Sequence, residues 1–170
     1  VIAYSAPPFR FKEVPFLDSV TSSVHFVSPV AYGLALAHAT VTEELVFLLL
    51  AFFAWGVASH AFGAVQDVVP DREAGISSIA TVLGARWTVR FALTMWVLSG
   101  VLMLFTVWPG TWGALIPVPY ILAVWPYRCI DDEHSAMANR GWRRFLALNY
   151  LCGFLATILL IWWVAVRFGG

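Results

Sequence analysis

The chain has 170 residues, of which 61% are hydrophobic and 12% carry a charge, and its mean hydropathy is +0.80. These values are far too apolar for an ordinary soluble domain and indicate a protein of the lipid bilayer. Ten basic residues balance ten acidic ones, and no basic run typical of nucleic-acid binding is present, so the expected partners are membrane lipids and lipophilic molecules, with no nucleic acid.

The first fifteen residues contain three prolines together with Arg10, Lys12 and Glu13. Proline cannot continue a helix, so this segment is expected to be an extended loop at the membrane interface. The chain begins with valine instead of methionine and shows no signal peptide, and we expect it to be a piece of a longer protein.

Residues 16–38 form the first expected membrane span, and this span is unusually polar. Its polar side chains are those of Asp18, Thr21, Ser22, Ser23, His25 and Ser28. Because polar groups inside a bilayer must contact protein or a water-filled space, one face of this helix is expected to line a cavity.

The second expected span, residues 44–66, begins almost wholly apolar and becomes small and polar towards its end. Four residues recur at spacings of four, three and four: Gly56, His60, Gly63 and Asp67. They therefore fall on one stripe, where the glycines allow a neighbouring helix to approach closely. His60 should point the same way as Asp67, as a supporting residue of a cavity.

A cluster of charges, Asp67, Asp71, Arg72 and Glu73, follows this span. Two carboxylates about one helical turn apart can share a hard cation, and Mg²⁺ typically takes one or two carboxylates and completes its shell with water or substrate phosphate. The same spacing also occurs in solvated loops whose charges pair with one another. Pro70 cannot donate to the Gln66 carbonyl, so the helix is expected to break or kink between the two aspartates.

Three more apolar runs, residues 87–107, 111–128 and 145–166, are each close to the length that a membrane span needs. The sequence therefore predicts an all-α fold, a polytopic transmembrane helix bundle of about five spans, forming a single membrane domain over residues 1–170. Pro117, Pro119 and Pro126 should kink the fourth span.

Basic residues give the orientation of the bundle. Nine of the ten fall on one side: Arg10, Lys12, Arg72, Arg86, Arg90, Arg128, Arg140, Arg143 and Arg144. Arg167 alone lies on the other side, so the positive-inside rule assigns the crowded side to the cytoplasm. The acidic pair lies on that side, as does the loop 131–134, which we interpret as a solvated linker.

Residues 60–84 resemble the second aspartate-rich motif of the UbiA family of membrane prenyltransferases, including Gly75 and the stretch 81–84. Within it, residues 66–76 are most similar to those of the lycopene elongases, which add five-carbon prenyl groups to a C40 carotene. Residues 4–12 resemble a second family element, the loop that carries a tyrosine, proline and basic residues.

The resemblance implies a Mg²⁺-dependent transfer of an allylic prenyl group from a donor such as dimethylallyl diphosphate to a lipophilic acceptor. The acceptor would be a carotenoid such as lycopene, in C50 carotenoid biosynthesis, within a bacterial or archaeal cell membrane. The implied residues are Asp67 and Asp71 as catalytic metal ligands, Arg10, Lys12 and Arg72 as diphosphate ligands, and Tyr4, His60 and Gly63 as cavity-lining residues.

Family members surround a central cavity with nine helices and two aspartate-rich motifs, and this chain matches the last five helices and the second motif. We therefore expect the chain by itself to be inactive. The flank of the first span with Asp18, Thr21 and His25 would face lipid where the other helices belong. Ser77 stands where many members carry a basic residue.

Other interpretations fit parts of the pattern. Within the enzyme class, quinone, haem or chlorophyll precursors are alternative acceptors. In a cation-coupled transporter or channel, Asp67, His60 and the polar first span would form a cation pathway. The acidic pair lies at a helix end beside Pro70 and the sequence shows no inverted repeat, which favours the enzyme. A purely structural membrane subunit would leave the pattern of residues 67–75 unexplained.

Overall fold

The computed structural model describes residues 10–168, apart from the side chains of Lys12 and Phe168. Its elements are η1 (Phe11–Glu13), α2 (Leu17–Leu36), α3 (Glu43–Val65), α4 (Val68–Glu73), α5 (Ile79–Leu83), α6 (Ala85–Met103), η2 (Gly110–Leu115), α7 (Val118–Val124), η3 (Trp125–Tyr127), η4 (Ser135–Met137) and α8 (Ala138–Phe168). The described residues include no strand, which confirms the all-α prediction.

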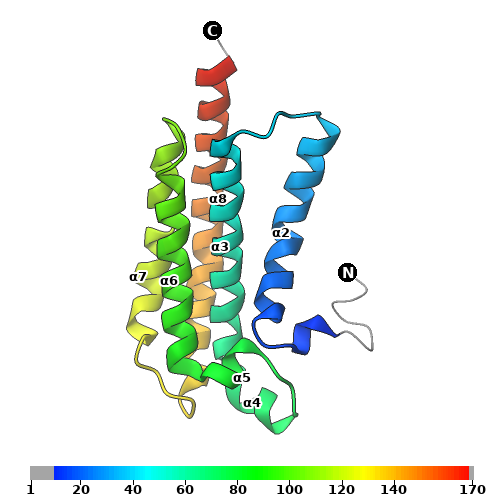
Figure 1. Cartoon of the computed structure of the whole chain (residues 1–170). Helices are drawn as coiled ribbons and strands as arrows, with labels where there is room; N and C mark the ends of the chain where they lie inside the picture. Colours follow the sequence, from blue (N-terminus) through cyan, green and yellow to red (C-terminus); the bar gives the residue numbers. More distant parts are fainter. Residues whose placement is uncertain (1–9, 169–170) are drawn as a thin grey trace.

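The long helices lie side by side and alternate in direction (Figure 1). The short elements η1, α4 and α5 gather at one end of the bundle, together with the loop from α7 to α8; we call this the motif end. The segment Glu43–Val65 and the segment Ser135–Arg167 are long and apolar enough to cross a membrane.

The fourth predicted span is the least regular. It consists of η2, α7 and η3 instead of one kinked helix. Pro117 is the N-cap of α7, Pro119 lies in the first turn of α7, and Pro126 lies in the first turn of η3. The first backbone N–H groups of a helix have no intrahelical partner, so proline is tolerated there. The three prolines therefore mark places where this span begins a new helical segment.

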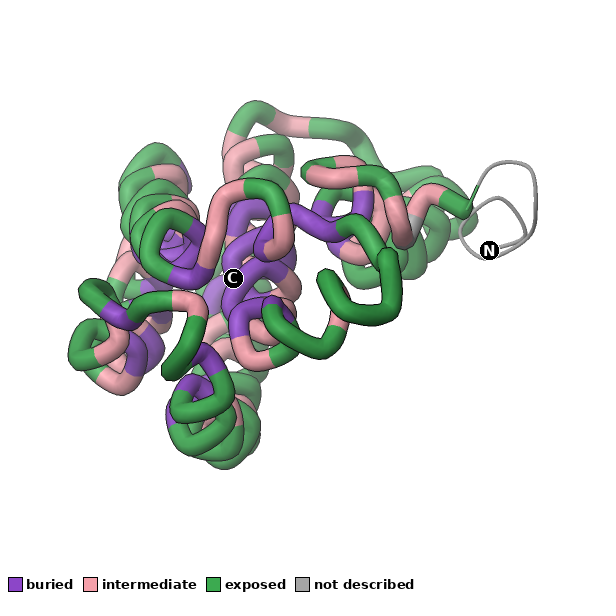
Figure 2. Tube along the Cα trace, turned by 90° about the horizontal axis from the view of Figure 1, so that it is seen from below, coloured by how far each residue is buried: buried purple, intermediate pink, exposed green. Residues whose placement is uncertain are grey.

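Aromatic side chains join α3, α6, α7 and α8 in the middle of the bundle. We call Trp55, Phe62, Trp96, Tyr120 and Phe145 the aromatic layer. Its ring centroids lie 5.1 Å apart for Tyr120 and Phe145, 5.9 Å for Trp96 and Tyr120, and 6.1 Å for Phe62 and Trp96. Such offset or edge-on pairs are favourable beyond the area that they bury. Viewed from the motif end, buried positions gather on the inward sides of the helices (Figure 2).

Small residues let α2 approach α3. The Ser23 hydroxyl donates to the Phe53 carbonyl at 2.6 Å, and a Cβ atom on Gly56 would lie 2.5 Å from the Ser23 oxygen. The close approach expected at Gly56 is therefore confirmed. Gly63 is close to a different helix, because a Cβ atom there would lie 3.1 Å from the Trp142 ring of α8.

Asp18, in the first turn of α2, corrects one expectation. Its side chain is fully buried and does not face lipid. One carboxylate oxygen accepts from the Ser19 N–H at 2.6 Å, and the other accepts from the Ile79 N–H at 2.9 Å. The expectation was wrong because α5 returns to the start of α2 and supplies a backbone donor. His25 is exposed and Thr21 is half-buried.

Replacing Asp18 should therefore destabilise the protein. Asp18→Ala leaves the buried Ile79 N–H without its acceptor, which typically costs about 1–3 kcal/mol. Thermal unfolding in detergent, followed by circular dichroism, measures the change. Thr21→Ala is the matched control, because the Thr21 hydroxyl donates only to carbonyls of its own helix. Equal melting temperatures for Asp18→Ala and the parent would contradict the role given to this carboxylate.

Candidate active site

The two aspartates of the charge cluster follow a break in the helical backbone. Helix α3 ends at Val65, Asp67 is the N-cap of α4, and Asp71 lies within α4. We had expected a break between the two aspartates, but the break comes before Asp67. In one continuous helix Pro70 would have to donate to the Gln66 carbonyl, whereas a helix that restarts at Val68 places Pro70 in its first turn.

The end of α4 fixes the backbone of Asp71. The Ile76 N–H donates to the Asp71 carbonyl at 2.8 Å, and the Gly75 N–H donates to the Arg72 carbonyl at 3.2 Å. This pair of bonds is a Schellman motif, and it requires a left-handed residue, here Gly75 with φ of 69°. The turn that ends α4 therefore explains the glycine at position 75.

The pKa values of Asp67 and Asp71 are both raised. Partial burial raises the pKa of Asp67, and a hydrogen bond from Gln66 offsets part of that rise. Partial burial also raises the pKa of Asp71, and the negative charge of Asp67 raises it further. A cation between the two groups would relieve this repulsion. Gln66 is itself held by Asn139, whose amide donates to it at 2.6 Å.

His60 and Gly63, which were predicted to line a cavity, lie against different neighbouring helices. The His60 ring lies 3.1 Å from the Ser19 hydroxyl of α2, measured from Nδ1 to Oγ. Gly63 faces α8, so the predicted stripe contacts two neighbouring helices. The lining of a substrate cavity by His60 and Gly63 stays a prediction.

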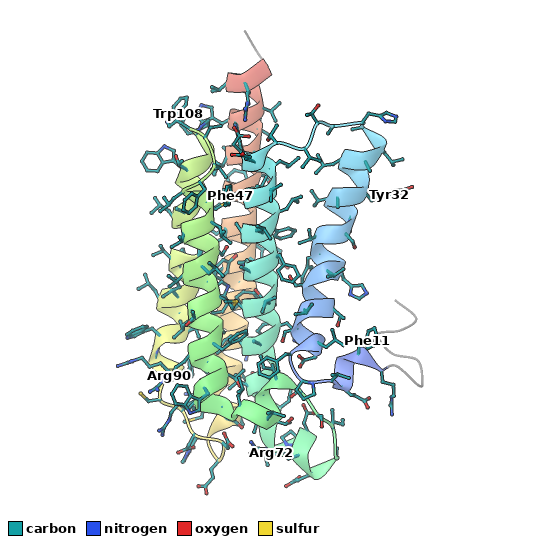
Figure 3. The ribbon with its side chains drawn as sticks, in the orientation of Figure 1. Phe11, Tyr32, Phe47, Arg72, Arg90 and Trp108 are labelled. Atoms are coloured by element: carbon teal, nitrogen blue, oxygen red, sulfur yellow. The ribbon has the colours of Figure 1, made fainter. Side chains whose placement is uncertain are left out.

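The described end of the first loop, which contains η1, and the charge cluster lie at the same end of the bundle, where Figure 3 labels Phe11 and Arg72. Arg10 pairs with Glu13, with 3.0 Å between Nη2 and Oε1. Tyr4 and the side chain of Lys12 lie outside the described residues, so their expected roles stay predictions.

Arg72 is held by a partner that we had not expected. Its Nη1 lies 2.5 Å from an oxygen of Asp132, and its Nε and Nη2 donate to the Thr81 carbonyl at 3.0 and 2.8 Å. Its salt-bridge partner therefore lies outside the charge cluster, in the loop between α7 and α8. The predicted contact of Arg72 with diphosphate would require some of these bonds to be exchanged.

Asp132 is the residue that the sequence interpretation missed. Its second oxygen accepts from the Ala85 N–H at 2.6 Å, at the start of α6. Burial alone would raise the pKa of Asp132, but the hydrogen bonds from Ala85 and Arg72 and the charge of Arg72 hold it below its ordinary value. The solvated-linker interpretation is wrong for this residue, although Asp131 is exposed and pairs with His134. Asp132 also lies close to Gly84, where a Cβ atom would be 3.0 Å from its carboxylate.

A cavity of about 480 Å³ lies among α3, α6, α7 and α8, with a mainly apolar lining. Its wall on α3 runs from Leu48 to Trp55, and Tyr120 lines it from α7. Helix α3 ends at Val65, just before Asp67, and Val65 is ten residues beyond Trp55, which corresponds to about 15 Å along the helix axis. The cavity is therefore remote from the acidic pair and suits an apolar chain.

Comparison with known proteins gives a consistent set of relatives. The UbiA prenyltransferase family profile matches residues 1–150. The chain is 50% identical, over 98% of its length and 39% of the relative's, to the C(50) beta-cyclic carotenoids biosynthesis protein LbtBC of Dietzia sp.. It is 44% identical to the lycopene elongase/hydratase of Corynebacterium glutamicum, over 95% of the chain and 56% of the relative.

A more distant relative is the lycopene elongase/hydratase of Haloferax volcanii, which is 33% identical over 95% of the chain and 50% of the relative. The chain thus spans roughly two fifths to somewhat over half of the length of these relatives. No solved structure matches the chain.

The contacts of Asp132 predict unequal effects for two neighbouring carboxylates. Asp132→Ala should lower stability by about 1 kcal/mol, because it removes the side-chain acceptor at the start of α6. It should also speed amide hydrogen exchange at Ala85. Asp131→Ala is the matched control and should change little, since Asp131 bonds only within its exposed loop. Similar unfolding and exchange for the two variants would show that Asp132 does not hold this segment.

Proposed function

The chain belongs to the UbiA prenyltransferase family, and from that premise we propose that the whole protein transfers an allylic prenyl group from its diphosphate to a carotenoid. The observation that carries this proposal is the acidic pair, Asp67 and Asp71, which lie one helical turn apart at one end of a membrane helix bundle. An alkyl transfer from a diphosphate needs positive charge at that place.

The acidic pair fits a magnesium ion. Mg²⁺ needs only one or two carboxylates when substrate phosphate and water complete its shell. Within residues 10–168 no group of three or more acidic, histidine or cysteine side chains could hold a metal, so Asp67 and Asp71 would act as a pair. When bound, Mg²⁺ would supply positive charge for the leaving diphosphate.

Basic groups of the chain would take part at the same end. We propose that Arg10 and Lys12 bind phosphate oxygens, the first as a planar fork and the second as a point charge. Arg72 could join them after leaving Asp132. Together these groups would orient the diphosphate, while the apolar interior excludes water from the reactive prenyl cation.

The proposed acceptor is a carotenoid such as lycopene, and the donor is dimethylallyl diphosphate. Three relatives carry names that refer to lycopene elongation or to C50 carotenoid biosynthesis. The apolar cavity beyond Trp55 and Tyr120 supports a lipophilic acceptor with a long chain. These relatives favour a carotenoid over quinone, haem or chlorophyll precursors, and the family match favours an enzyme over a transporter.

The proposed site faces the cytoplasm. The loops and helix starts that carry Arg72, Arg86, Arg128 and Arg140 lie at the motif end (Figure 1). At the opposite end Arg167 pairs with Glu44, with 3.3 Å between Nη2 and Oε1. The positive-inside rule then supports a cytoplasmic motif end, where diphosphates are available.

Removing either aspartate should abolish most of the activity. In the whole protein, Asp67→Ala and Asp71→Ala should each reduce the rate of prenyl transfer by about 10²-fold or more, since each removes a preorganised charge-bearing group. Product formation from lycopene and dimethylallyl diphosphate at saturating Mg²⁺ measures the effect. Glu73→Ala is the matched control, because Glu73 is an exposed neighbour without a proposed role. Parental turnover in either aspartate variant would remove the basis for the metal site.

A second prediction concerns the 170-residue chain by itself, which we propose to be the C-terminal portion of a longer prenyltransferase domain. The chain should give no turnover with Mg²⁺, donor and lycopene, because opposing ligands would come from elsewhere in the family fold. Co-expression with the N-terminal portion of the Corynebacterium glutamicum relative should restore product. That portion expressed without the chain is the control. Prenyl transfer by the purified chain alone would contradict the need for both parts.

A further inference from the structure

Two arginines from different helices meet on the outer surface near the motif end. Arg90 lies in α6, and its Nε donates to the carbonyl of Arg128, at the end of η3, at 3.2 Å. Arg128 folds back over the same turn, where its Nη1 donates to the Trp125 carbonyl at 3.1 Å. Both guanidinium groups are therefore held around one short segment of backbone.

Each of these arginines lies over an exposed tryptophan. The Arg90 guanidinium carbon is 4.9 Å from the centre of the Trp87 ring, and that of Arg128 is 4.8 Å from the centre of the Trp125 ring. The tryptophans are 61% and 52% exposed. Cation–π contact orients a guanidinium group without neutralising its charge. Tryptophan is also the residue typical of the boundary between lipid tails and headgroups.

The charge of this pair is uncompensated within the part of the chain that the structure describes. The salt bridges there involve other basic residues, namely Arg10, Arg72, His134 and Arg167. Arg90 donates through Nε and Arg128 through Nη1, which leaves several N–H groups of each fork available to an anion. Figure 3 shows Arg90 on the outer side of the bundle.

Apolar surface continues from the two arginines towards the middle of the bundle. On α6, Val97 and Val101 are exposed one and two turns beyond Thr94, and on α7 Leu122 is 68% exposed. Arginines at the end of such a surface lie where a lipid phosphate would stand above its acyl chains. This arrangement offers both parts of a phospholipid a matching surface.

We propose that Trp87, Arg90, Trp125 and Arg128 form a binding site for the headgroup of an anionic phospholipid, whose acyl chains lie along α6 and α7. This site is separate from the acidic pair and does not depend on the proposed reaction. The phosphate would accept from both guanidinium forks, bidentate geometry that lysine cannot provide.

The test compares lipids that differ only in headgroup. Native mass spectrometry of the intact protein, released from neutral detergent, would count bound phosphatidylglycerol and phosphatidylcholine with identical acyl chains. We expect the parent to prefer phosphatidylglycerol, and Arg90→Gln with Arg128→Gln to lose about thirtyfold in that preference, as expected for two basic residues near a lipid surface. Arg90→Lys with Arg128→Lys should fall in between.

The matched control is Arg140→Gln with Arg143→Gln, which removes two exposed charges from the same end of the bundle. An equal loss in this control would overturn the site in favour of general electrostatic attraction. Competition by inorganic phosphate at lipid-equivalent concentration would also overturn it, since a free anion would then be the ligand. If the glutamine variant fails to fold, the double variant Trp87→Leu with Trp125→Leu is measured instead. A preference for phosphatidylglycerol equal to that of the parent would then contradict the proposal.

Discussion

Two carboxylates from distant parts of the chain hold the segment between α3 and α6. Asp18 accepts from the Ile79 N–H at the start of α5, and Asp132 accepts from the Ala85 N–H where α5 gives way to α6. Asp132 also pairs with Arg72, next to Asp71. A buried N–H group without an acceptor lowers the stability of the fold, and Ile79 and Ala85 are both buried. The position of the acidic pair therefore depends on α2 and on the α7 to α8 loop.

Local pattern was sufficient for most of the helices. The apolar runs of α3 and α6 carry strong signals, and their observed bounds lie close to the predicted spans. The fourth span failed as a single helix because three prolines recur there, and each one can begin a new helical turn as readily as kink an old one. The start of α8 also came seven residues earlier than expected, since Asn139 and Arg140 continue the helix beyond its apolar part.

The candidate site residues also differ in whether the local sequence predicts them. Asp67, Asp71 and Gly75 lie within one short stretch, so spacing and family resemblance were enough to select them. Asp132 is sixty residues from Arg72 in sequence, and nothing in the local composition of its loop distinguishes it from Asp131. Long-range pairing of charges depends on how helices return to one end of the bundle, which periodicity alone does not specify.

Helix α8 has a consequence for where chemistry takes place. Its 31 residues correspond to about 46 Å, whereas the hydrocarbon layer of a bilayer is about 30 Å thick. The first turns of α8 are the polar ones, and there Asn139 contacts Gln66 and Trp142 contacts Gly63. The segment just before the acidic pair is thus held by these polar first turns, at the end where α8 continues beyond its apolar part. The proposed donor, a water-soluble diphosphate, and the proposed acceptor, a carotene dissolved in lipid, would meet there, each still in its own solvent.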